Sequence, residues 1–414
     1  MMAAPLVTET RNLTVDANRL GTVLLLFIGG LLVPAAHADT WEQVTGSETL
    51  QQLVSGATAT IEIDEDKRVV GKYFEDGTAK IEAWGETFDR TWQVQGEDQV
   101  CYSSLTETNC FRFERSQEQP NRYRVINVET RQFTYFEVEG GADTVASVPV
   151  SDAQEGGLAG PSASEIAAEL SNPNSTLGTM NFQIDYQTYQ GDLPGASDQG
   201  ATRVTFQPAL PYPISETTNF FFRPAFPIII RQDIPTGPGS FDTAEYELGD
   251  ISFDASLGKS MGGGNIIIGG LAGTLPTATD DDLGLDQWLL GPQLGYAKMA
   301  KWGIAGLLIS HQRDVAGEDD FDTKITGGQY FYAFNMGNGW QINSGPTFSY
   351  NHEARDNDNK LTLPLGIGAS KTVFLSGRPW KFGAQYWHYI ESPDDFGLDY
   401  QIRFSISPVV SLPW

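Results

Sequence analysis

The sequence predicts an all-β chain with two parts, a C-terminal transmembrane antiparallel β-barrel of about 12 strands and, before it, a small periplasmic antiparallel β domain. Three observations predict this. The chain begins with an export signal, apolar and polar side chains alternate with a period of two over residues 177–414, and long acidic connections alternate with short ones. The composition agrees, because 44 glycines, 11% aromatic residues and only 19% charged residues are typical of a β-rich protein.

Residues 1–38 have the pattern of a secretory signal peptide. Two arginines precede an apolar run, 21–33, which ends in the small-residue sequence Ala36-His37-Ala38. We therefore expect export from the cytoplasm and cleavage after Ala38. No later segment has the roughly 18 consecutive apolar residues that a transmembrane helix needs.

Two cysteines, Cys101 and Cys110, lie in the exported part of the chain. An oxidising compartment favours a disulfide between them. A metal or redox site is not expected, because there is no C-x-x-C spacing and no nearby histidine. The sequence indicates no cofactor. The net charge of -27 excludes a nucleic-acid partner, since phosphate neutralisation needs clustered lysines and arginines.

Residues 39–140 have the pattern of a small β domain. Ser47 is the expected cap of a short helix, 48–55, with Gly56 ending it. Short alternating runs follow it, separated by turn residues, at 58–63, 69–74, 79–84, 88–94, 99–103, 110–113, 123–126 and 133–138. The pattern of Trp92, Gly96, Cys101-Tyr102 and Cys110-x-Arg112 is similar to that of small secreted lipocalin-like domains.

Residues 141–176 have the composition of a linker, rich in Gly, Ala, Ser, Pro and acidic residues. Inside it, 162–170 predicts a short helix that ends before Asn172-Pro173. Two alternatives stay open for this segment. It lies at the periplasmic mouth of the barrel, or it is an unstructured tether.

The barrel prediction rests on strands that have one face apolar enough for lipid and the other polar enough for water. In the last run, Ile402, Phe404 and Ile406 alternate with Arg403 and Ser405. Equivalent runs predict strands near 178–188, 201–212, 217–230, 246–258, 264–274, 287–298, 301–312, 323–334, 339–352, 360–374, 379–390 and 399–412.

The connections between these runs alternate in length and charge. Every second connection is short: 213–216, 259–263, 299–300, 335–338 and 375–378. The others are long and acidic. Because outer-membrane barrels have long extracellular loops and short periplasmic turns, the loop around Asp319 is expected outside the cell and the turn around Gly337 inside. Residues 39–176 are then periplasmic.

Alternation also predicts which charged side chains line the barrel interior, because a charge facing lipid costs several kcal/mol. The candidates are Asp185, Arg203, Arg223, Asp250, Asp254, Lys381 and Arg403. Closure brings the last strand beside the first, which makes Arg403 and Asp185 expected partners, and Arg223 can meet Asp250 or Asp254. Such pairs either fill a narrow lumen or form a selectivity constriction.

An enzymatic role is not expected, and no catalytic residue is assigned. Some membrane barrels hydrolyse lipids with a histidine and a serine on the outer face. After the signal peptide the histidines are His311, His352 and His388, and none has a serine two residues later, the spacing that would put both on one face of a strand.

Several segments together resemble the outer-membrane family named for the MetA pathway of phenol degradation, whose bacterial members are often mislabelled neuromedin U. The likeness covers about residues 169–414 and rests on 222–228, 247–251, 273–282, 288–293, 315–320 and 386–393. It implies a barrel that transports small molecules of the aromatic or hydrophobic class. The terminal aromatic Trp414 resembles the signal that the barrel-insertion machinery reads.

The sequence thus predicts an outer-membrane channel or transporter, surrounded by lipid and lipopolysaccharide, for a small-molecule solute. The β domain of residues 39–140 is a departure from the family. It supports an alternative, a non-transporting envelope protein whose barrel anchors a periplasmic binding domain.

Overall fold

The structure, a computed structural model, describes residues 40–64, 67–131, 133–138, 145–146, 148–149, 160–318 and 320–412. The predicted signal peptide, residues 141–144, 147 and 150–159 of the linker, Asp319 and Trp414 lie outside these ranges. No helix in the described part of the chain is long and apolar enough to cross a membrane.

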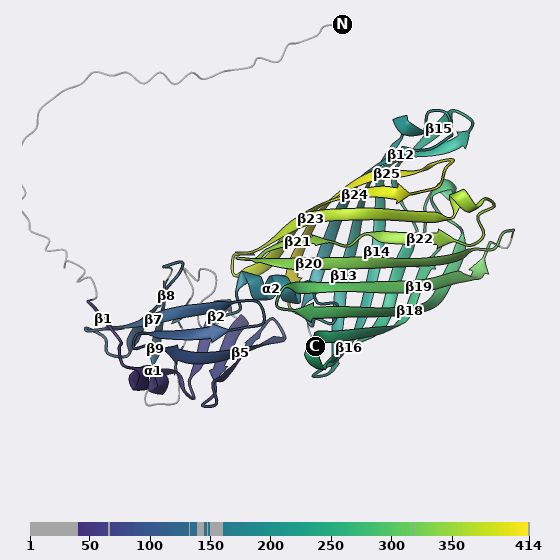
Figure 1. The fold of residues 1–414 in the computed structure, drawn as a ribbon. Helices are drawn as coiled ribbons and strands as arrows, with labels where there is room; N and C mark the ends of the chain where they lie inside the picture. The colour runs from purple at the N-terminus through teal and green to yellow at the C-terminus, as the bar shows by residue number, and fades with distance from the viewer. Residues whose placement is uncertain are drawn as a thin grey trace, which may run out of the picture. The chain divides into compact units, whose positions relative to one another are not determined.

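The first sheet is an antiparallel meander that follows chain order from β2 to β9 (Figure 1). β1 pairs with β7, β10 with β9, and β11 pairs parallel to β2. Its elements are β1 (Trp41–Gln43), α1 (Ser47–Val54), β2 (Thr58–Asp64), β3 (Lys67–Tyr73), β4 (Thr78–Ala83), β5 (Glu86–Gln95), β6 (Gln99–Ser103), β7 (Thr108–Ser116), β8 (Arg122–Asn127), β9 (Phe133–Val138), β10 (Val145–Ala146) and β11 (Val148–Pro149).

The interior of this β domain is apolar, with Ile81, Val100 and Phe113 almost fully buried. The expected disulfide joins Cys101 on β6 to Cys110 on β7, which lie opposite each other in the register of the two strands. The disulfide therefore links the two strands of one hairpin of the meander.

Helix α1 differs from its prediction at its start. It begins at Ser47, and Gly46, with a φ of 102°, occupies the cap position without any side-chain cap hydrogen bond. Ser47 is therefore a helical residue rather than the cap. A glycine suits this position because its positive φ is unfavourable for residues with a Cβ atom.

The second sheet contains the long strands of the chain. They are β12 (Gly178–Gln190), β13 (Gly200–Ser215), β14 (Thr218–Gly237), β15 (Ser240–Leu248), β16 (Ile251–Met261), β17 (Asn265–Leu275), β18 (Gln287–Ala300), β19 (Gly303–Gly317), β20 (Lys324–Gly337), β21 (Trp340–Ser344), β22 (Thr347–Asn351), β23 (Leu361–Leu375), β24 (Arg378–Glu391) and β25 (Gly397–Val410). Short 3-10 turns lie at Ala196–Asp198, Gly262–Gly264, Asp281–Leu283 and Asn357–Asn359.

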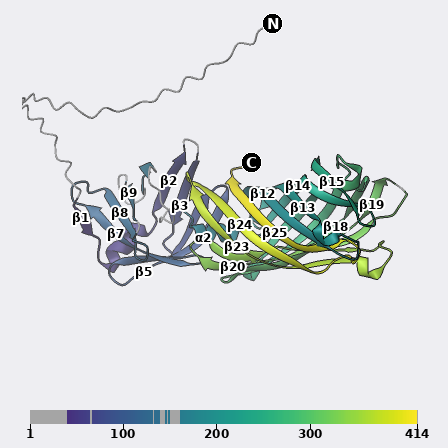
Figure 2. The ribbon, with the colours of Figure 1, turned by 90° about the horizontal axis from the view of Figure 1, so that it is seen from above.

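This sheet closes on itself. β25 pairs with β12, β12 with β13, and β13 with β14, so the sheet has no free edge between its first and last long strands. Figure 2 shows the yellow β25 beside the teal β12 at this closure. β21 and β22 both pair with β20 and β23 and act as two halves of one strand. The described chain thus forms a closed antiparallel barrel of twelve strands, which confirms the predicted fold class.

Two predicted strands are broken in the structure. The run 246–258 is divided at Gly249, where β15 ends as a hairpin partner of β14 and β16 begins. Here Gly249 donates its N–H to the carbonyl oxygen of Pro227. The run 339–352 is interrupted at Gly345-Pro346, because proline has no N–H to donate to a neighbouring strand.

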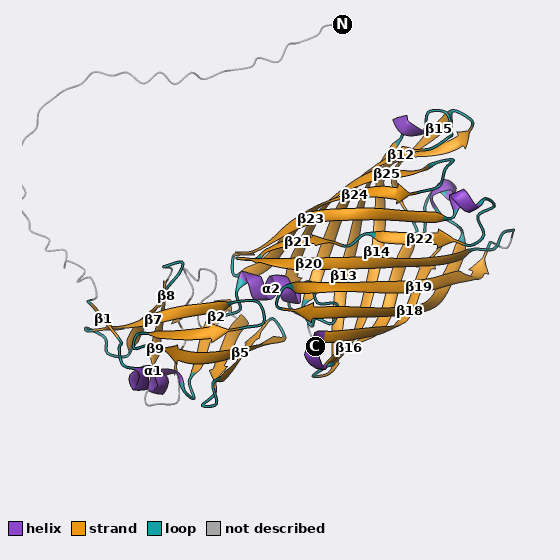
Figure 3. Cartoon of the chain, viewed as in Figure 1, coloured by secondary structure: helices purple, strands orange, loops and turns teal. Residues whose placement is uncertain are grey.

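The predicted linker helix is α2 (Ala163–Glu169). Ser162 caps it, and Ser162 and Glu165 form a reciprocal capping box. α2 packs against β20, β21, β23 and β24, at the barrel end where the connections are short (Figure 3). Of the two open alternatives for this segment, the described residues from Gly160 onward are structured against the barrel rather than free.

Candidate functional site

The two faces of the barrel strands differ sharply in polarity. On β12, Ile184 and Tyr186 are 40% and 48% exposed, whereas Asp185 and Gln187 are 1% and 5% exposed. On β25, Phe404 is 53% exposed. The apolar side chains therefore cover the outside and the polar ones point into the barrel, as a membrane-spanning barrel requires.

An ion pair lies inside the barrel where it closes. Arg403 on β25 donates from Nε to Oδ1 of Asp185 at 2.7 Å and from Nη2 to Oδ2 at 2.8 Å. Gln401 donates to the same carboxylate at 3.1 Å, and the guanidinium lies 4.3 Å from the ring centre of Trp387. The pairing of Arg403 with Asp185 that closure predicts is present.

A second arginine lies across from the same carboxylate. Arg203 on β13 is in register with Asp185, but its Nη2 donates to Gln187 at 3.4 Å. Its buried Nε has no hydrogen-bond partner among the described residues. Two guanidinium groups thus accompany one carboxylate here, which leaves the interior locally cationic.

Arg223 on β14 pairs with Asp254 on β16, with Nε 3.0 Å from the nearer carboxylate oxygen. The other predicted partner, Asp250, lies outside the strands and is not paired with it. The carboxylate of Asp250 accepts instead from the backbone N–H groups of Thr277, Ala278 and Leu285. It therefore organises a connecting loop. Alternation misassigned Asp250 because the strand is broken one residue earlier.

Lys381 on β24 points inward, as predicted, but its partners are neutral. Its Nζ lies 3.0 Å from Oγ of Ser171 and 2.9 Å from Oε1 of Gln341. Ser171 comes from the segment after α2 and also donates to Gln341 at 3.1 Å. Strand alternation alone cannot predict this contact, because Ser171 is not part of a strand.

Residues 160–177, called here the mouth segment, make further contacts at the short-turn end of the barrel. Ser164 accepts from the N–H of Gly339 at 3.0 Å. Asn174 donates to the carbonyl oxygen of Thr217 at 3.2 Å and to Oγ of Ser260 at 2.7 Å. Asn219 donates to the carbonyl oxygen of Asn174 at 2.7 Å. These partners belong to three different turns or strand ends, so the segment extends across the mouth.

A cavity of about 220 Å³ remains between the mouth segment and the barrel strands. Its lining combines apolar side chains with polar ones, among them Ser171, Arg223 and Gln329. The main apolar members are Leu170, Pro173, Leu177, Pro211, Phe221 and Phe331. A cavity of this size and character can hold a small molecule with an apolar body.

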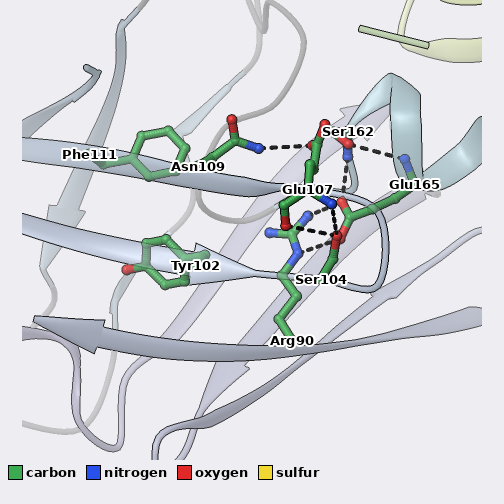
Figure 4. A pocket seen from close by; sticks show the side chains of 8 residues that line it. All are labelled: Arg90, Tyr102, Ser104, Glu107, Asn109, Phe111, Ser162 and Glu165. Carbon is green, nitrogen blue, oxygen red and sulfur yellow. Dashed lines mark hydrogen bonds and ion pairs between the residues drawn. The ribbon is translucent and has the colours of Figure 1, made fainter. Parts of the chain in front are cut away.

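The mouth segment is also bound by the β domain. Arg90 on β5 donates from Nε to Oε1 of Glu165 at 2.8 Å and from Nη2 to the carbonyl oxygen of Gly160 at 2.8 Å. Both charged side chains are almost completely buried. Figure 4 shows Arg90 facing Glu165, with Ser162 beside them. The pair is closed and hydrogen-bonded, so it is a contact rather than a ligand site.

The described residues give no candidate metal site. They contain no group of three or more His, Cys, Asp or Glu side chains placed to hold a metal ion. His311 and His352 share the hydroxyl of Thr326, at 2.9 and 2.8 Å, and all three side chains are exposed or partly exposed. His388 lies 3.8 Å from Asp399.

Neither a protein-family model nor a curated protein matches the chain. Solved structures similar to it include an outer membrane channel from Pseudomonas putida F1, at 14% identity and a TM-score of 0.47, with 57% of this chain and 96% of that chain covered. The monoaromatic hydrocarbon channel CymD has 10% identity and a TM-score of 0.32, with 57% and 88% covered. The toluene transporter TodX of Pseudomonas putida has 10% identity and a TM-score of 0.30, with 59% and 93% covered. The assignment of the barrel therefore rests on its own strand pairing.

Proposed function

We propose that this protein is an outer-membrane channel for small molecules. The observation that carries the proposal is the closed twelve-stranded barrel with an apolar outside and an interior lined by charged and polar side chains. Barrels of about 8 strands are filled by side chains, and those of about 16 to 18 leave a wide channel. Twelve strands suit a narrow passage that charged side chains can control.

The solute class is a small aromatic or hydrophobic molecule. The apolar cavity beside Arg223 supports this, because an apolar body contacts Phe221 and Phe331 there while a polar substituent faces the polar lining. The sequence resemblance to the family of the MetA pathway of phenol degradation points to the same class.

The orientation proposed for the barrel puts the long connections outside the cell and residues 39–176 in the periplasm. It follows from the short turns, such as the one at Gly337, lying at the opposite end from loops such as 276–286. Cysteine at Asp319 should react with an impermeant thiol reagent on whole cells, and cysteine at Gly337 should not. The reverse pattern contradicts the orientation.

Ion selectivity tests the channel itself. Arg223→Ala and Arg403→Ala should shift the reversal potential in a salt gradient toward cations, because each removes a positive charge from the interior. Heat-modifiable folding in gels shows that the barrel still forms. Unchanged selectivity in both variants, or no conductance in the wild-type protein, would contradict the proposal. That result would favour a barrel that only anchors the β domain.

A further inference from the structure

The mouth segment is wide enough to block the lumen of this barrel. A helix with its side chains is about 10 to 12 Å across, which is comparable to the lumen of a barrel between the filled 8-stranded and the open 16-stranded cases. α2 contacts four neighbouring strands, and Asn174 reaches the turn before β14 on another part of the wall. The segment therefore stands in the path of a solute that leaves through the short-turn end.

Hydrogen bonds hold the segment in the barrel, and water can replace them. The contacts of Ser164, Ser171 and Asn174 with the barrel are neutral hydrogen bonds or single bonds to Lys381. Each contributes little net free energy, because water can replace it on release. The cavity of about 220 Å³ on one side shows that the segment does not fill the space behind it.

The segment is attached to the β domain by a buried ion pair. Arg90 and Glu165 form a buried, two-pronged ion pair, and breaking such a pair leaves a buried charge without a partner. Ile166, on the next position of α2, is fully buried in an apolar cluster that contains both Phe113 of the β domain and Val409 of β25. Thr176 donates its N–H to Glu86 on β5 at 3.0 Å. The segment is therefore joined to the β domain by a buried ion pair, whereas its polar contacts with the barrel wall are hydrogen bonds.

We propose that residues 160–177 are a plug that closes the channel at its short-turn end, and that the β domain controls the plug through the Arg90–Glu165 pair. This inference rests on the proposed channel function. The plug leaves the barrel by exchanging its weak polar contacts for water while the buried ion pair keeps it attached to the β domain. Movement of the β domain is thereby converted into opening of the channel.

The first test changes the strength of one plug contact in the full chain. Ser171→Asp adds a charge pair with Lys381 and should lower the open probability in planar bilayers several-fold, whereas Ser171→Lys places two cations together and should raise it. The matched controls are Ser240→Asp and Ser240→Lys, in the hairpin of β14 and β15, which should leave gating unchanged. Equal gating in both Ser171 variants overturns the proposal.

The second test removes the plug. Residues 161–175 are replaced by a Gly/Ser sequence of the same length, and barrel folding is checked by heat modifiability. We expect a several-fold higher mean conductance than in the wild-type protein. Equal, stable conductance with and without the plug overturns the plug and leaves the channel function standing. No conductance from the folded, plug-free barrel overturns the channel function and the plug with it.

The third test addresses the control by the β domain. Arg90→Leu should change the open probability several-fold, and Arg90→Lys, which keeps the charge but loses the two-pronged contact, should change it less. Arg112→Leu is the matched control, because Arg112 pairs with Asp98 on the exposed surface of the same domain. Gating that is as insensitive to Arg90→Leu as to Arg112→Leu overturns the role of the β domain.

Discussion

The two sheets of this protein differ in the polarity of the face that they bury. In the β domain, Ile81 and Phe113 are inside and the alternate residues face water. In the barrel, Asp185 is inside and its neighbours Ile184 and Tyr186 are outside. Both sheets alternate with a period of two, so alternation shows that a strand has two unlike faces. The medium around the sheet decides which of the faces is buried.

The largest expected effect comes from Phe113→Ala in the β domain. It removes a fully buried aromatic side chain and should cost about 4 kcal/mol of β-domain stability. Limited proteolysis of the detergent-solubilised protein in increasing urea measures this loss. Phe404→Ala, which truncates an aromatic side chain on the outside of the barrel, should leave the protease sensitivity of the β domain unchanged. Equal effects of the two variants would contradict the opposite orientation of the sheets.

Asp185→Ala should destabilise the barrel by about 3 kcal/mol, because it leaves the largely enclosed Arg403 without its counter-charge. Urea unfolding in lipid vesicles, followed by tryptophan fluorescence, measures the change. Glu353→Ala provides the comparison, since it removes one partner of an exposed ion pair with Lys324, and such pairs contribute little. If both variants unfold at the same urea concentration, the interior pair does not stabilise the barrel.

Replacement of both cysteines by serine should cost about 2 to 3 kcal/mol of β-domain stability, because the disulfide closes a short loop in the unfolded chain. The same proteolysis assay measures it, and heat modifiability should show an unchanged barrel. In the native protein, thiol labelling without reductant should be negative. Full labelling of Cys101 and Cys110 would show that no bridge forms.

The smallest expected effect is a pH dependence of the plug. Burial, with the charge of Glu86 as a second cause, raises the pKa of Glu169 from its ordinary 4.5 to about 8. The docked plug therefore favours the protonated carboxyl. This contribution is complete below pH 4.5 and is lost as the pH rises through about 8. Open probability should rise as the pH increases toward about 8 and level off above it, and Glu169→Gln should remove the rise. A variant that retains the full pH response would assign it to another group.

Much of the fold follows from the sequence because it is encoded locally. Period-two alternation shows the strands, and the lengths of the connections show their order around the barrel. Closure then places the last strand beside the first, and this alone is enough to predict that Arg403 and Asp185 are partners. Two breaks escaped detection: the break after Gly249 removes Asp250 from its expected face, and Gly345-Pro346 divides one strand in two.

Only the tertiary structure decides what the linker does. The composition of 160–177 is equally consistent with a tether, and nothing in its local pattern indicates Lys381 or Arg90 as a partner. Ser171 and Lys381 are brought together by the closure of the barrel, and Arg90 meets Glu165 because the meander of the β domain presents β5 to α2. The face of a strand on which a side chain lies follows from its neighbours in the sequence. These contacts join segments that are far apart in the sequence and meet only when both sheets have formed.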